Sequence, residues 1–364
     1  MNTNKYIFSS LLAGCLGTAC AHNAVSHQLF PDQVNKDYLR DMAKYPIEMG
    51  ESGEETNVAP GVCNNFNFRF KKTDQGRAYG EAQPIFIMQH HTVGNFPSTR
   101  AIFLSKMPPL SAHYVNDKDG TVYYFVDGKY RAYHGGIGSL SENSKLNPDL
   151  PYDVLKNDIN SWSIGIENVN SGNEPYTPQQ ILANAAICQG IVDTYPTVNA
   201  KLMVGHSDWS PGRKIDPNPY FPWDKLANAQ DEPCFNELDI HTNFGIFPRK
   251  RDLVIHPNPA IVVGYKEKGA KLSEEEQAYV AKLHEYGYDI PEEELAVYGP
   301  TIKNAILSFK LHHAGQDILD DPALCAAWDA IYDDHKKIQD GNLLYQLNQN
   351  DVIYLDDLLD QFAK

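Results

Sequence analysis

Two histidines and an aspartate in this sequence could hold a metal ion. His206 and Asp216 stand on either side of a turn rich in proline and glycine, and His90 follows the apolar run 85–88. Zinc accepts imidazole nitrogens and carboxylate oxygens, and a site with three protein ligands keeps a fourth position open for water. Structural zinc sites usually fill all four positions from the protein, often with thiolates. The sequence therefore predicts a catalytic zinc site, with His91 as the alternative to His90.

Two further side chains could carry chemistry at such a site. Glu167 ends the apolar run 164–166, which is typical of a buried strand, so its carboxylate could pass a proton from water to a leaving group. Lys214 lies two residues before Asp216 and could stabilise an oxyanion. Zinc would lower the pKa of its bound water to about 7 and polarise a carbonyl. The predicted reaction is therefore hydrolysis at neutral pH. The alternative is that neither side chain is catalytic: Glu167 would then be an ion-paired structural carboxylate and Lys214 a solvated surface lysine.

Four blocks of sequence also resemble a known family. In chain order they are Met88–Gly94, Ser111–Val115 with Tyr133–Gly136, Ser163–Asn170 and Gly205–Pro217. They are similar to the zinc N-acetylmuramoyl-L-alanine amidases of amidase type 2, which share a fold with peptidoglycan-recognition proteins. Within that family, the AmiD-type outer-membrane lipoprotein amidases are the nearest in pattern.

The resemblance implies a role for each matching residue. It makes His90, His206 and Asp216 the zinc ligands, Glu167 the catalytic carboxylate and Lys214 a cation beside the metal. It also suggests substrate contacts for three more side chains, namely His134, Arg213 and His91. The family often has a small apolar residue before its first ligand, where this chain has Gln89.

The implied activity is hydrolysis of the amide between N-acetylmuramic acid and L-alanine, in peptidoglycan or in muropeptides, with one zinc per chain. A protein of the same fold that binds peptidoglycan without cleaving it is the alternative. Non-catalytic relatives typically lose a metal ligand, whereas the full set is present here. A zinc phosphodiesterase would explain the ligands but not the whole block 205–217.

Composition narrows the range of partners. The 364 residues are 42% hydrophobic, enough for a full core, and carry a formal net charge of -16 with a pI near 5.2. Nucleic-acid recognition requires a basic face, so nucleic acid is excluded as a partner. The chain also lacks a polybasic patch for a membrane surface. A peptidoglycan substrate would be held by local contacts in a pocket.

The first residues have the pattern of a bacterial export signal. Lys5 precedes the apolar run 6–14, which is too short to span a bilayer. The segment Leu12–Cys15 resembles a lipobox, in which Cys15 becomes the lipidated first residue; processing at Cys20 or Ala21 is the rival. We expect an outer-membrane lipoprotein facing the periplasm, with the lipid as its only membrane contact, or else a periplasmic or secreted protein.

The expected fold class is α/β, with a mixed central sheet flanked by helices and a smaller C-terminal three-helix unit. Strands are predicted over 85–88, 121–126, 162–167 and 202–205. A helix is predicted from Pro178 to about residue 195, with Thr177 as N-cap and Gln180 completing a capping box. The loop 135–160 either rims the site or is a surface connection. Cys188 falls on the apolar face of this helix and is interpreted as a buried free thiol.

The predicted domain organisation has six parts. They are a signal and lipobox region at 1–20, a leader at 21–60, the zinc amidase domain at 61–235, a linker at 236–269, a helical domain at 270–340 and a tail helix at 341–364. Ser273 and Glu276 form a predicted capping box at the start of the helical domain. The segment 286–309 resembles the three-helix peptidoglycan-binding module that accompanies such amidases; a structural appendage is the alternative.

Overall fold

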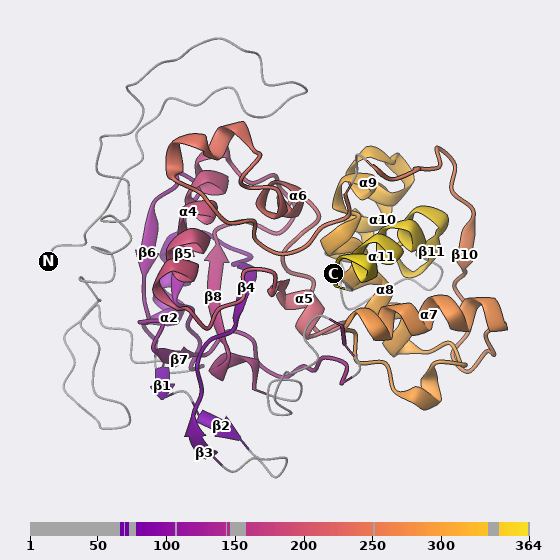
Figure 1. Cartoon of the computed structure of the whole chain (residues 1–364), viewed down its shortest axis with the longest axis horizontal. Helices are drawn as coiled ribbons and strands as arrows, with labels where there is room; N and C mark the ends of the chain where they lie inside the picture. Colours follow the sequence, from indigo (N-terminus) through magenta and orange to yellow (C-terminus); the bar gives the residue numbers. More distant parts are fainter. Residues whose placement is uncertain are drawn as a thin grey trace, which may run out of the picture.

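The computed structural model describes residues 66–68, 70–72, 78–105, 108–142, 144–145, 158–249, 252–333 and 342–362 (Figure 1). The predicted export signal, lipobox and leader lie outside these residues. Within the described ranges the chain forms two units, one built on a sheet and one built of helices. No helix in these ranges is long and apolar enough to cross a membrane.

A five-stranded mixed sheet forms the centre of the first unit. Its strands lie in the order β6-β5-β8-β4-β9. They are β6 Val122–Tyr124, β5 Tyr114–Asn116, β8 Ser163–Asn168, β4 Phe86–His91 and β9 Met203–Gly205. Strands β5, β8, β4 and β9 are parallel, and only β6 runs antiparallel to its neighbour. All four predicted strands are present, and the mixed α/β fold class is confirmed.

Helix α4 (Pro178–Thr194) covers this sheet. The Thr177 side chain accepts a hydrogen bond from the Gln180 backbone N–H, so the predicted N-cap is confirmed. The capping box is wrong, because the Gln180 side chain donates to the buried carbonyls of Asn116 and Val169 instead. Ile181 and Cys188 pack into the main core, and the Cys188 thiol is buried and free, as expected.

Shorter elements complete the first unit. They are β1 Phe66–Phe68 paired with β7 Tyr130–Ala132, β2 Phe70–Lys72 paired with β3 Ala78–Glu81, α2 Phe96–Phe103, α5 His206–Trp209, α6 Trp223–Ala227, and the 3-10 turns Ile159–Ser161 and Pro233–Leu238. Among these, α5 matters most for the site, because it begins directly where β9 ends.

The second unit contains the three predicted helices and more. The predicted ones are α7 Glu274–Tyr286, α8 Pro300–His313 and α10 Pro322–Asp333. The others are α9 Gly315–Asp320 and α11 Gln349–Phe362, with a two-stranded sheet of β10 Ile261–Val263 and β11 Leu347–Asn348. The Ser273 capping box is confirmed. Residues of α11 lie in the same core as α7 and α8, so the predicted tail helix is part of this unit.

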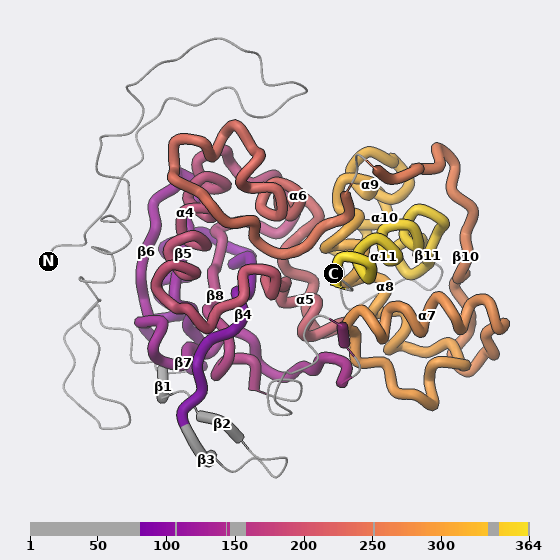
Figure 2. Tube along the Cα trace, viewed as in Figure 1, coloured from indigo at the N-terminus to yellow at the C-terminus, as the bar shows by residue number. Residues whose placement is uncertain are grey.

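The segment predicted as a linker is packed against both units. Phe244 is fully buried in the core of the first unit, and its N–H donates to the carbonyl of Leu226. Further on, Arg249 is paired with Asp357 of α11, and β10 belongs to the second sheet. Figure 2 shows the trace of this segment passing from the first unit to the second. The described residues of this segment, 236–249 and 252–269, therefore contact both units.

Candidate metal centre

The site lies at the carboxyl ends of the parallel strands, where α/β folds commonly bind ligands. His90 is near the end of β4, and Glu167 on the neighbouring strand β8 is its register partner. His206 is the first residue of α5, immediately after β9. Asp216 comes from the turn that follows α5. The topology thus brings together residues that are more than a hundred positions apart in sequence.

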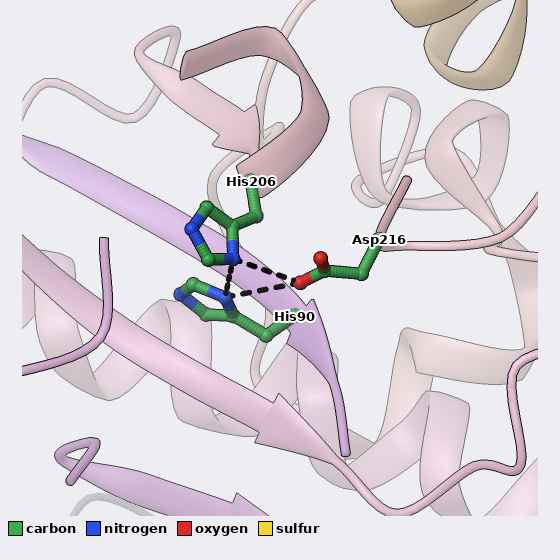
Figure 3. Close-up of side chains that lie close together, drawn as sticks. All are labelled: His90, His206 and Asp216. Carbon is green, nitrogen blue, oxygen red and sulfur yellow. Dashed lines mark hydrogen bonds and ion pairs between the residues drawn. The ribbon is translucent and has the colours of Figure 1, made fainter. Parts of the chain in front are cut away.

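His90, His206 and Asp216 form the single group of potential metal donors found in the described ranges. The Nδ1 atoms of the two histidines are 3.0 Å apart, and each lies within hydrogen-bonding range of Asp216 Oδ2, at 3.2 and 3.1 Å (Figure 3). The residues are only 1%, 3% and 7% exposed. Ligand atoms that lie about 2.0–2.2 Å from one tetrahedral zinc ion are roughly 3.3–3.6 Å from one another, and the three observed distances of 3.0–3.2 Å are close to this spacing. The spacing of these three atoms therefore fits such an ion.

The Nε2 atoms of both histidines, which face away from the three donor atoms, also have hydrogen-bond partners. His206 Nε2 lies 2.8 Å from the carbonyl oxygen of Gly135, to which it can only donate. His90 Nε2 lies 3.0 Å from His134 Nδ1, and His134 Nε2 lies 3.3 Å from Ser163 Oγ. Because Ser163 donates to the carbonyl of Ile159, a consistent chain of donors runs from His90 outward. Both Nδ1 atoms are then left as acceptors, which is the tautomer a metal ligand requires.

The electrostatics of the group match the same role. Burial and the neighbouring His206 lower the pKa of His90 to about 4. Burial opposes the ionisation of Asp216, but His206 and His90 beside it hold its pKa well below the usual range. Near neutral pH, His90 thus offers an uncharged imidazole and Asp216 an ionised carboxylate, and these are the protonation states that bind a divalent cation.

Glu167 has the surroundings expected of a proton carrier. Burial, followed by the negative charge of Asp216, raises the pKa of its carboxyl to about 8, although the positive charge of Lys214 lowers it. Its Oε2 is buried and has no hydrogen-bond partner within the described chain. Orphaned buried oxygens are rare in native proteins, and strongly perturbed carboxyl groups concentrate at functional sites. The charge of Lys214 also acts on His90, which places this cation at the same site.

The three predicted substrate contacts surround the metal donors. Arg213 donates to the carbonyls of Gly135 and Ile137, at 2.7 and 2.9 Å. His91 is buried, and its Nδ1 lacks a partner in the part of the chain described. His134 lies against His90, where it orients that ring. Their roles as substrate contacts stay predictions. Gly135 and Ile137 begin the loop 135–160, so the structure favours the prediction that the first residues of this loop lie at the rim of the site. Residues 143 and 146–157 of the loop lie outside the described residues.

Sequence reasoning missed two groups that support the site. Ser163 completes the chain of donors behind His90, and Asp208 caps α5 by accepting from the Gly205 N–H at 2.7 Å. Gln89, the departure from the family pattern, faces away from the metal donors. Its side chain exchanges hydrogen bonds with Asn184, at 3.0 and 2.9 Å, and accepts one from Asn168 at 3.1 Å. This buried amide network ties β4 and β8 to α4.

With this geometry in view, comparison with known proteins shows that the site lies in a segment similar to a known family. Residues 80–219 match the family model of N-acetylmuramoyl-L-alanine amidase. This segment includes all three metal donors together with Glu167 and Lys214. The matched segment therefore coincides with most of the first unit, and the helical unit lies beyond it.

Individual relatives agree. The chain is 31% identical over 120 residues to the 1,6-anhydro-N-acetylmuramyl-L-alanine amidase AmpD of Haemophilus influenzae, covering 33% of this chain and 58% of that protein. It is 30% identical over 155 residues to the N-acetylmuramoyl-L-alanine amidase AmiD of Escherichia coli, covering 38% of this chain and 50% of that protein. The chain thus spans about half the length of these relatives.

A solved structure of AmiD from E. coli shares the fold over a longer range. That structure is a complex with the substrate anhydro-N-acetylmuramic acid-L-Ala-D-gamma-Glu-L-Lys. The match covers 80% of this chain and 95% of that one, at 19% sequence identity and a TM-score of 0.50. The likeness extends past the amidase segment, so it includes at least part of the helical unit.

Proposed function

We propose that this protein is a zinc-dependent hydrolase that cuts the amide bond between N-acetylmuramic acid and L-alanine in peptidoglycan or muropeptides. The observation that carries the proposal is the buried triangle of donor atoms from His90, His206 and Asp216, 3.0–3.2 Å apart, inside the segment that matches the amidase family. When bound, zinc would polarise the amide carbonyl and acidify a water molecule.

The chain's own residues have separate tasks in this proposal. Glu167 takes a proton from the attacking water and returns it to the leaving amine of L-alanine. Its pKa of about 8 in the metal-free protein is close to the working pH, as efficient proton transfer requires. Lys214 stabilises the negative charge that develops on the carbonyl oxygen. His134 and Gly135 keep the two imidazole rings in the ligating orientation.

Non-catalytic binding of peptidoglycan is the competing function. It needs neither a complete set of metal donors nor a desolvated carboxyl next to them. Both are present here, which favours hydrolysis. The names of the relatives point to muropeptides as the substrate class, and the amidase family description fits the proposed bond.

Product analysis by mass spectrometry tests the proposal. The zinc-loaded protein is incubated with a panel of muropeptides that differ in sugar form and stem length. We expect a free peptide that begins with L-alanine and a sugar that keeps its lactyl group. The Asp216→Ala protein serves as the inactive control. Intact muropeptides after incubation with folded, zinc-loaded protein would contradict the proposal and leave the binding function.

We further propose that the protein is exported and lipidated on Cys15, which places it on the outer membrane facing the periplasm. The support is the Leu12–Cys15 sequence behind a short apolar run. Fractionation of cells that express the native chain or Cys15→Ala tests this. The variant should leave the membrane fraction; an unchanged membrane-bound share would shift attention to Cys20.

A further inference from the structure

Three side chains of the second unit reach the short helix that carries a metal donor. Tyr288 donates its hydroxyl hydrogen to Asp208 Oδ1 at 2.8 Å, and His312 Nδ1 lies 2.7 Å from Asp208 Oδ2. Ser308 donates to the backbone carbonyl of Ser207 at 2.8 Å. Ser207 and Asp208 directly follow His206 in α5. In Figure 1, α5 lies on the side of the first unit that faces the second.

Asp208 is the centre of these contacts. Its carboxylate accepts from Tyr288, from His312 and from the Gly205 N–H, and the residue is only 6% exposed. A buried carboxylate depends on such donors, because an unpaired one pays the full cost of desolvation. Two of the three donors come from the second unit. The conformation of α5 in the first unit is therefore stabilised from outside that unit.

The same turn fixes the distance between two metal donors. The Ser207 N–H donates to the backbone carbonyl of Asp216 at 2.8 Å, and the Ser210 N–H donates to that of His206 at 2.9 Å. A displacement of Ser207 and Asp208 would move His206 relative to Asp216. Metal affinity is sensitive to such support, since outer partners of ligands typically change it 10- to 100-fold.

The ring of His312 is itself held between the units. Trp223 of the first unit stacks on it, with centroids 3.8 Å apart and planes 27° apart. On its other side His312 stacks on His313, at 4.0 Å and 11°. The His312 ring is thus held by stacking against one residue from each unit, while its Nδ1 contacts Asp208.

We propose that Tyr288 and His312 are positioning residues of the metal centre: acting through Asp208, the second unit holds the turn that carries His206 in its ligating position. The inference rests on the proposed zinc function. It assigns to the second unit a part in the site that is separate from any contact with peptidoglycan.

Two tyrosines two positions apart give a matched test. Tyr288→Phe removes the bond to Asp208, whereas Tyr286→Phe removes an equally buried bond, 2.7 Å long, to His313 within the second unit. Each variant of the full chain loses one hydroxyl. Zinc affinity is measured by competition with a chelating dye, and thermal unfolding is followed in parallel. We expect Tyr288→Phe to bind zinc about 10-fold more weakly and Tyr286→Phe to bind it as the parent does.

Two further measurements separate positioning from general destabilisation. Saturating zinc should restore the turnover of Tyr288→Phe to near the parent value. His312→Asn, which keeps a donor near the Nδ1 position, should bind zinc more tightly than His312→Leu. Equal zinc affinities for Tyr288→Phe, Tyr286→Phe and a zinc-binding parent would overturn the inference alone. A parent that binds no zinc would overturn the proposed function and the inference with it.

Discussion

Two buried polar clusters, one in each unit, are built in opposite ways. In the second unit, Lys310 and Asp351 form a closed ion pair of 2.6 Å in which both side chains are 2% exposed. In the first unit, His90, His206 and Asp216 direct acceptor atoms toward one another, and among the described residues no lysine or arginine forms an ion pair with Asp216. Acceptors that converge repel one another unless a cation lies between them. A buried charge alone therefore does not indicate a metal site. Several acceptor atoms that converge without a donor from the protein do indicate one.

Removal of the metal should give the largest difference between the two clusters. A chelator that strips the protein should abolish turnover of a muropeptide, because the three acceptors of the first unit would lose the cation they share. The Lys310–Asp351 pair needs no ion, so the second unit should keep its fold. Turnover and circular dichroism before and after chelation check this, and added zinc should restore activity. Full turnover by metal-free protein would contradict the assignment.

Disrupting the Lys310–Asp351 ion pair should lower the stability of the protein and leave its zinc content unchanged. Lys310→Met leaves Asp351 buried without its main partner, and such a change typically costs about 3–5 kcal/mol of stability. Zinc bound per folded chain should not change, because the pair does not touch the metal donors. Urea unfolding and metal analysis of the same sample measure both quantities. A loss of zinc from the folded variant would show that the pair also supports the site.

Glu167→Gln sharpens the distinction between ligand and proton carrier. The amide keeps the size of the side chain but cannot take up a proton, so turnover should fall by about 10²-fold or more. Zinc content and substrate affinity should stay near those of the parent. Steady-state kinetics with metal analysis decide the point. Lost zinc would instead make Glu167 a ligand or the support of one.

The metal-free protein should show the raised pKa of Glu167 in its stability. Below pH 4.5, the ordinary pKa of the group, folded and unfolded chains both hold the proton. From there up to about 8, the folded pKa, only the unfolded chain releases it, so stability falls as pH rises. Glu167→Gln should lack this loss and become more stable than the parent at pH 8, by up to roughly 4–5 kcal/mol, since each unit of pKa shift corresponds to about 1.4 kcal/mol. Urea unfolding of both metal-free proteins at pH 4 and pH 8 measures it; a constant difference would contradict the burial of an ionisable Glu167.

The parts of the molecule that could be predicted are those with local signals. The apolar runs at β4, β8 and β9 and the N-cap at Thr177 are encoded within a few residues. The metal donors follow from the block 205–217 and from a histidine at a strand end. Strand β5 was missed because only two apolar residues, Tyr114 and Val115, stand between His113 and Asn116, too few to form an apolar run. The Gln180 capping box was wrong because two buried carbonyls, of Asn116 and Val169, compete for the same amide.

The support of the site could not be predicted, since it depends on contacts across the chain. Ser163 contacts His134, which lies 29 positions earlier in the sequence. Tyr288 and His312 contact Asp208 from the second unit. No residue near Asp208 in the sequence indicates its two partners in the second unit, which lie 80 and 104 positions away. Such pairings follow from how the two units dock and not from any single segment.

Zinc content is the most direct test of the central claim, that His90, His206 and Asp216 form one metal centre. Metal analysis is made on the purified parent and on His206→Ala and Asp216→Ala, each shown to be folded by circular dichroism. We predict about one zinc per parent chain and almost none in either variant, because each substitution removes one of only three protein ligands. Full occupancy in both variants, or none in the parent after incubation with zinc, would contradict the account.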